Sequence, residues 1–287
     1  MNGQHSNHMG GKKQNHKPNS LKNLIINSWK LHILLIIFLT TLVYLNTYQN
    51  EYVWDDIDFI INWDAKKSFD NIPAFFRGEV PDGHEGVYRP MRGIFYVIAY
   101  KMFGQELAGY HTLAILVHIT CTMMIYFIAR HIMKKGLPAF IAALLFGLHP
   151  IHTESITYMT ASFDMIGVMF MLGSFYLYAR ARGNRSEHKK NKNRHMIELI
   201  VSAVLGIIAM LTYELALSLP LLIVLYDTCF FREKKLSKYI SRIPTYLMYF
   251  GGFVLYFLLK MLVPPTDNRG GYLAGSLYHT MLAMSKA

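Results

Sequence analysis

An all-helical bundle that crosses a membrane several times is the fold class that the sequence predicts. Hydrophobic residues make up 53% of the 287 residues and charged residues only 16%, which is more apolar than a soluble domain of this size requires. Several windows of roughly 17 to 22 residues carry no charge, and a helix needs this length to cross about 30 Å of hydrocarbon. Basic residues lie in short clusters between these windows, a pattern typical of multi-pass membrane proteins.

About seven crossings are predicted, together with one helix that is too short to cross. The short helix lies in the first external loop, from Arg89-Pro90 to Phe103-Gly104. At about 14 residues it is predicted to be re-entrant or to lie on the membrane surface. The crossings are predicted at residues Leu24–Leu45, Gly109–Ile128, Leu137–Leu148, Ile156–Tyr178, Met196–Leu211, Leu215–Phe231 and Pro244–Val263.

The basic clusters predict how the bundle is oriented. Residues 130–135, 180–195 and 232–242 are rich in Lys and Arg and fall at every second connection. The positive-inside rule therefore places them, and the N-terminus, in the cytoplasm. The net charge of +11 is thus explained by topology, and no nucleic-acid partner is expected.

Three segments follow from this topology. Residues 1–23 are polar and predict a disordered cytoplasmic tail. Residues 24–263 form the membrane module, whose first external loop, with juxtamembrane helices, spans residues 46–108. Residues 264–287 are predicted to be an external C-terminal segment.

Acidic, His and Arg side chains gather on the predicted external side. Asp164 is predicted to lie about two helical turns inside the fourth crossing, where an ionisable group costs several kcal/mol unless it is paired or hydrated. That expense indicates a functional role. The candidate residues are Asp55, Asp56, Arg89, Arg92, His149, His152, Glu154, Asp164 and Glu214.

This combination suits a substrate that is part lipid and part polar. Arg binds phosphate through paired hydrogen bonds at the headgroup level. A carboxylate can take the proton from an acceptor hydroxyl as a general base. The residue types alone leave other interpretations open, with Asp55 and Asp56 as helix caps and Arg89 and Arg92 as anchors at the membrane surface.

His149, His152 and Glu154 raise the question of a metal. They carry enough ligand atoms for a divalent ion. Histidine at a membrane surface more often serves there without binding a metal. A divalent metal therefore stays a possible cofactor, but no metal ligand is assigned.

Several short motifs occur at the candidate positions. They are Val53-Trp54-Asp55-Asp56, Tyr88-Arg89-Pro90, Leu148-His149-Pro150-Ile151-His152-Thr153-Glu154, Asp164, and Glu214 followed by Leu225-Tyr226-Asp227. At these motifs the sequence resembles the transmembrane and tetratricopeptide-repeat O-mannosyltransferases, over roughly residues 24–263. The resemblance implies a GT-C glycosyltransferase module with seven transmembrane helices and a polyprenyl phosphate sugar as the donor substrate.

The resemblance also implies roles for the candidate residues and for partners. Asp55 or Asp56 would be the catalytic carboxylate. The acceptor would be a hydroxyl of a protein or glycan on the periplasmic or luminal side, with mannose as a candidate sugar and the bacterial plasma membrane as the expected location. A repeat-containing protein would be a further partner, beside the membrane lipids. The substrate-binding residues would be Arg89, Arg92, His149, His152, Glu154, Asp164 and Glu214.

The sequence departs from the family pattern at three places. Ala161-Ser162-Phe163-Asp164 lacks the Arg of a Gly-Arg-x-Asp motif, Tyr213-Glu214 lacks the Lys of a Lys-Glu motif, and no tetratricopeptide repeats follow. The chain would be a truncated product, one half of a split system or a bare module. Two alternatives to an enzyme stay open: a non-catalytic membrane protein that binds or transports a lipid-linked saccharide, and an inactive partner module.

Overall fold

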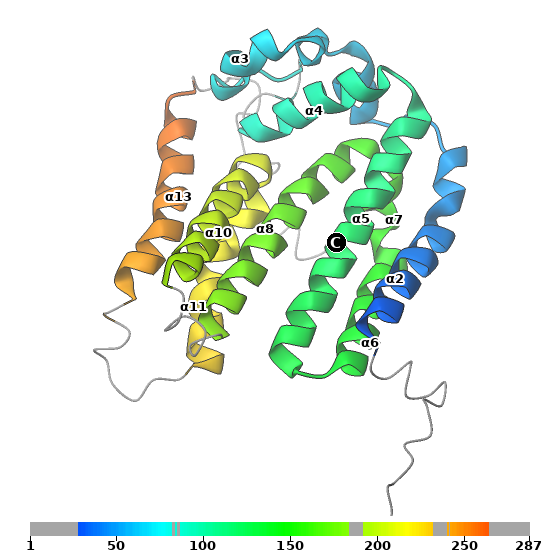
Figure 1. Ribbon diagram of the computed structural model, residues 1–287. Coiled ribbons are helices and arrows are strands. Elements are labelled where there is room, and N and C mark those ends of the chain that lie inside the picture. Colours follow the sequence, from blue (N-terminus) through cyan, green and yellow to red (C-terminus); the bar gives the residue numbers. More distant parts are fainter. Residues whose placement is uncertain are drawn as a thin grey trace, which may run out of the picture.

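The computed structural model describes residues 28–81, 84, 87–183, 192–231, 240 and 242–263, and every regular element in these ranges is helical. The predicted all-helical bundle is therefore confirmed, while the predicted segments 1–23 and 264–287 lie outside the described residues. Figure 1 shows the long helices side by side. They are α2 (Trp29–Tyr44), α5 (Leu107–Met133), α6 (Gly136–Gly147), α8 (Met159–Gly183), α10 (Lys192–Thr212), α11 (Leu219–Phe230) and α13 (Ile243–Met261).

Five helices in the described part of the chain are long and apolar enough to cross a membrane, and a bent helix pair raises the number to six. The five are Trp29–Gln49, Leu107–Met133, Met159–Gly183, Asn193–Thr212 and Ile243–Met261, so they coincide with five of the seven predicted crossings. The crossing predicted at Leu215–Phe231 consists instead of a 3-10 turn, η6 (Glu214–Ser218), and the 12-residue α11. Such a helix alone is shorter than the roughly 20 residues that a crossing needs.

The crossing predicted at Leu137–Leu148 is the bent pair. α6 continues through a 3-10 turn, η5 (Pro150–His152), into α7 (Thr153–Thr157), with a bend of 46°. Pro150 explains the break, because proline has no amide hydrogen and disfavours helical geometry in the residue before it. Two carbonyl groups at the break are also contacted from other helices: the His118 ring contacts the Gly147 oxygen at 3.0 Å, and the Tyr44 hydroxyl donates to the His149 oxygen at 3.0 Å.

A layer of short helices covers the end of the bundle that lies at the top of Figure 1, here called the upper end. α4 (Pro90–Phe103) starts with Pro90 at its first position, where a proline is favoured, and stops at Gly104 with a φ of 59°. Its 14 residues confirm the predicted short helix, which lies across the bundle (Figure 1). The other members of the layer are the π-helix η2 (Ile57–Asn62), the 3-10 turns η3 (Asp64–Lys67) and η4 (Phe69–Asn71), and α3 (Ile72–Phe76).

Lys66 links two segments of this layer. Its buried ammonium group donates to the carbonyl oxygen of Trp63 at 2.7 Å and lies 5.2 Å from the centre of the Tyr100 ring of α4. Burial lowers the pKa of Lys66 to about 8. The contacts join the end of η2 to α4, and so hold the two segments that carry the candidate aspartates and arginines in one relative position.

Long-range contacts show that alternate connections meet at opposite ends. At the upper end, Arg89 before α4 contacts Glu214 at the start of η6. At the opposite, lower end, Arg182 of α8 and Arg242 before α13 both contact Asp227 of α11. Arg182 and Arg242, which belong to two of the predicted basic clusters, therefore lie at the lower end, and most of the candidate residues lie at the upper end.

Candidate functional site

Two arginines at the start of α4 meet two carboxylates from distant parts of the chain. Arg89 donates through Nε to Glu214 at 2.6 Å and through Nη1 to both oxygens of Asp164 at 2.8 Å. Arg92 donates through Nη1 to Asp164 at 2.8 Å. These four residues, the ion-pair cluster, join α4, α8 and the turn between α10 and α11. Two positive and two negative groups balance each other, so Asp164 has the partners that its depth in the bundle requires.

Both guanidinium groups lie over aromatic rings. The guanidinium carbon of Arg92 lies 4.5 Å from the ring centre of Phe59 and 5.7 Å from that of Tyr96, and the guanidinium carbon of Arg89 lies 4.9 Å from that of Tyr213. These are cation–π distances. The stacking restricts the orientation of the guanidinium planes, which prepares their remaining N–H groups to bind an anion.

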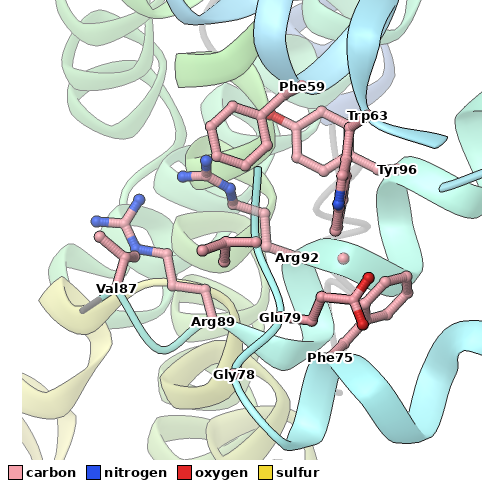
Figure 2. A pocket seen from close by; sticks show the side chains of 11 residues that line it. Phe59, Trp63, Phe75, Gly78, Glu79, Val87, Arg89, Arg92 and Tyr96 are labelled. Carbon is pink, nitrogen blue, oxygen red and sulfur yellow. The ribbon is translucent and has the colours of Figure 1, made fainter. Parts of the chain in front are cut away.

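A small pocket lies beside the arginines, and its volume of about 20 Å³ has room for about one water molecule. Figure 2 shows the guanidinium groups of Arg89 and Arg92 extending to one side of it and the Glu79 carboxylate to the other. Aromatic rings form much of its wall, so the pocket offers an apolar surface beside fixed positive groups. Its lining residues are Phe59, Trp63, Phe75, Gly78, Glu79, Val80, Val87, Arg89, Arg92, Gly93 and Tyr96.

Asp56 is completely buried and saturated with hydrogen bonds. Its carboxylate accepts from the Thr160 hydroxyl and amide, both at 2.7 Å, from the Met159 amide at 3.4 Å and from the Val53 amide at 3.2 Å. The amides of Met159 and Thr160 belong to the first turn of α8, where backbone donors have no partner within the helix. Asp56 therefore caps α8 from another segment, and these donors occupy both of its carboxylate oxygens.

Substituting Asp56 is expected to destabilise the fold. In Asp56→Asn the amide group cannot accept from all of these donors, so the loss should be about 2 kcal/mol or more, seen as a lower midpoint of thermal unfolding in detergent. Asp58→Asn is the control, since 47% of the Asp58 side chain is exposed. An unchanged midpoint in Asp56→Asn would contradict the capping role.

The same variant has an expected pH dependence. Burial raises the pKa of Asp56, and the four hydrogen bonds lower it by less. A raised pKa in the folded state means that the wild-type carboxyl group adds stability as the pH falls through that value, and this contribution is lost as the pH rises. The difference in unfolding midpoint between wild type and Asp56→Asn should therefore widen towards acidic pH.

Asp55 differs from its neighbour in exposure and contacts. Its side chain is 45% exposed and lies 3.8 Å from Nδ1 of His84, while Nε2 of His84 lies 3.1 Å from Asp58. Burial and the nearby Asp55 carboxylate raise the pKa of the Tyr158 hydroxyl. The His84 ring in turn contacts Phe59, with 4.8 Å between ring centres, and Phe59 is the residue that stacks on Arg92. Asp55 is thus accessible and connected to the pocket through a chain of contacts.

The remaining candidates occupy the bend after α6. His149 accepts a hydrogen bond from the Ile151 amide at 3.1 Å, and the His152 ring packs against Phe146 at 4.4 Å and His118 at 5.2 Å. Glu154 is exposed. Within the described ranges, these three residues make no hydrogen bond or ion pair with the ion-pair cluster, and no three His, Cys, Asp or Glu side chains gather in a way that could hold a metal ion.

Several residues of the site are not among the candidates that the sequence predicts. Thr160 could have been found, because it precedes Asp164 by four positions on α8 and so shares its face. His84 and Glu79 lie in a loop, where spacing predicts nothing about contacts. The sequence marks Tyr213 only as the position where the family pattern has Lys, but the Tyr213 ring stacks on Arg89.

Comparisons with curated proteins show a distant similarity to protein O-mannosyl-transferases. The chain is 26% identical over 161 residues to Protein O-mannosyl-transferase F38B6.6 of Caenorhabditis elegans, 27% over 195 residues to Tmtc1 of Drosophila melanogaster, and 25% over 157 residues to TMTC3 of Homo sapiens. These matches cover 53%, 66% and 53% of this chain, but only 23%, 22% and 17% of the relatives.

The resemblance read from the motifs is therefore confirmed as a distant one, and the chain spans less than a third of the length of these relatives. No family model matches the chain, and no solved structure matches it significantly. The similarity relates the chain to membrane glycosyltransferases. The donor, the acceptor and the activity belong to the proposal that follows.

Proposed function

We propose that this chain is the membrane module of a glycosyltransferase that moves a sugar from a polyprenyl phosphate to an acceptor hydroxyl on the external side. The observation that carries the proposal is the ion-pair cluster beside an aromatic pocket, at the upper end of a membrane bundle. Arg182 and Arg242, described members of the Lys- and Arg-rich segments, lie at the lower end, and the positive-inside rule makes that end cytoplasmic. The upper end then faces the periplasm or lumen.

The site suits each part of such a donor. The prenyl chain would stay in the hydrocarbon, and the phosphate would meet Arg89 and Arg92, whose planar guanidinium groups bind phosphate oxygens in pairs. Side-chain exposures of 19% for Arg89 and 8% for Arg92 put both groups in a poorly hydrated setting, which strengthens attraction to an anion. The sugar would then extend towards Asp55.

The reaction would proceed by direct displacement. Asp55 takes the proton from the acceptor hydroxyl, and the hydroxyl oxygen forms a bond to the anomeric carbon as the bond from that carbon to the phosphate oxygen breaks. The arginines stabilise the negative charge that develops on the leaving polyprenyl phosphate. Displacement from the opposite face inverts the anomeric carbon.

The similarity to protein O-mannosyl-transferases makes mannose the first sugar to test and a protein hydroxyl the first acceptor. Purified protein in detergent would be incubated with a panel of polyprenyl phosphate sugars and a peptide rich in Ser and Thr. The expected result is release of polyprenyl phosphate together with a glycosylated peptide. If labelled lipid-linked sugar crossed the bilayer of vesicles that contain the protein and no product formed, the chain would be a transporter.

Arg89→Gln is expected to weaken donor binding by roughly ten- to a hundredfold, because one charge-assisted contact to phosphate is lost. Arg89→Lys should recover part of the loss, since it restores the charge without the planar pair of donors. Binding of a polyprenyl phosphate sugar by titration calorimetry measures both effects. Lys101→Gln, which removes an exposed charge at the far end of the same helix, is the matched control and should bind normally.

A further inference from the structure

Glu214 occupies the position on Arg89 where a ligand anion would bind. Its Oε2 accepts from Arg89 Nε at 2.6 Å, the shortest of the contacts within the ion-pair cluster. We infer that Glu214 is an internal substitute for the phosphate group of the ligand, and that it leaves Arg89 when the phosphate arrives. This inference rests on the proposed function and adds a regulation of the same site.

The contacts distinguish Glu214 from the other carboxylate. Asp164 binds both arginines and is 21% exposed, so releasing it would leave two guanidinium groups without a partner. Glu214 contacts Arg89 alone within the cluster and is 33% exposed. It is also the first residue of a 3-10 turn between α10 and α11, a position from which its side chain can turn towards solvent. Glu214 is therefore the exchangeable partner and Asp164 the permanent one.

Charge balance gives the physical reason for an exchange. The cluster is neutral when two arginines face two carboxylates, and an incoming phosphate would add negative charge in a partly buried site. Such an excess is unfavourable where water does not screen it. Withdrawal of Glu214 restores the balance and frees Nε of Arg89 for a phosphate oxygen. Glu214 therefore competes with the ligand, and its removal should tighten binding.

The test measures binding rather than transfer. Farnesyl phosphate, a short prenyl phosphate, would be titrated calorimetrically into the wild type, Glu214→Gln and Glu79→Gln in detergent. Glu79→Gln is the matched control, because Glu79 lies on the wall of the same pocket and the substitution removes an equal charge. Glu214→Gln is expected to bind on the order of tenfold more tightly, and Glu79→Gln by less than about threefold.

Two results would overturn the exchange. One is Glu214→Gln binding no more tightly than the wild type, and the other is an equal gain in Glu79→Gln, which would indicate a general charge effect. In an Arg89→Gln background the gain from Glu214→Gln should disappear, and its persistence would also contradict the inference. Equal unfolding midpoints of the variants exclude a change in folding as the cause.

Titrations with two further compounds identify the source of the anion. They also separate this inference from the proposed function. Inorganic phosphate in place of farnesyl phosphate shows whether the phosphate alone is exchanged, and farnesol shows the part of binding that needs no anion. A tightening by Glu214→Gln for either phosphate supports the exchange. Wild-type protein that transfers sugar while Glu214→Gln fails to tighten binding would reject the exchange and keep the transferase. Tightened binding by Glu214→Gln without sugar transfer by the wild type would support the exchange and reject the transferase.

Discussion

Asp55→Asn is expected to lower sugar transfer at least a hundredfold while the protein stays folded. Removal of a general base typically costs a factor of 10²–10⁴. Of the two neighbouring aspartates, Asp55 is 45% exposed and Asp56 is 0% exposed, so only Asp55 can reach an acceptor hydroxyl. The amide of Asn keeps the size of the side chain and can still contact His84 and Tyr158. Initial rates of glycosylated peptide formation, at saturating donor, measure the loss.

Asp58→Asn is the matched control for this prediction. Asp58 also contacts His84 and is 47% exposed, so the variant removes the same charge from the same loop. Asp58→Asn should keep most of the transfer rate. If Asp55→Asn kept full activity and Asp58→Asn lost it, the catalytic carboxylate would be Asp58. Donor binding by both variants should match the wild type, because neither residue contacts the ion-pair cluster.

Asp227→Asn is expected to cause the largest loss of stability, about 3–5 kcal/mol. Asp227 is 0% exposed and accepts from the Tyr178 and Tyr246 hydroxyls at 2.9 and 2.7 Å, from Arg182 at 3.0 Å and from Arg242 at 3.4 Å. These partners come from α8, α13 and the segment before α13. The substitution would remove the buried negative charge that Arg182 and Arg242 share.

Thermal unfolding in detergent measures this effect, and a drop of on the order of 10 °C is expected for a domain of this size. Cys229→Ser is the control, because Cys229 is exposed two positions further along the same helix. It should unfold at the wild-type midpoint. A drop of less than about 2 °C in Asp227→Asn would mean that the network contributes little to the stability of the lower end.

Prediction from sequence succeeded where the signal is local. Apolar windows identified five crossings, and Arg89-Pro90 identified the start of the short helix because proline favours a first helical position. The cost of a charge inside the bundle singled out Asp164, which the structure places between Arg89 and Arg92. The motif Leu225-Tyr226-Asp227 contributes only to the family resemblance, and nothing in its spacing shows that Asp227 joins three elements.

A multi-pass helical bundle, with most of the candidate carboxylates and arginines on one side, can be predicted from the sequence alone. Hydropathy and charge decide this, because each crossing depends on the transfer of a single segment into hydrocarbon. The folded structure was needed to show that Asp56 caps α8 while Asp55 stays exposed, and that Glu214 pairs with Arg89 across 125 positions of the chain. These contacts depend on which side chains are buried and on the distance between remote segments. A local sequence pattern carries no information about either.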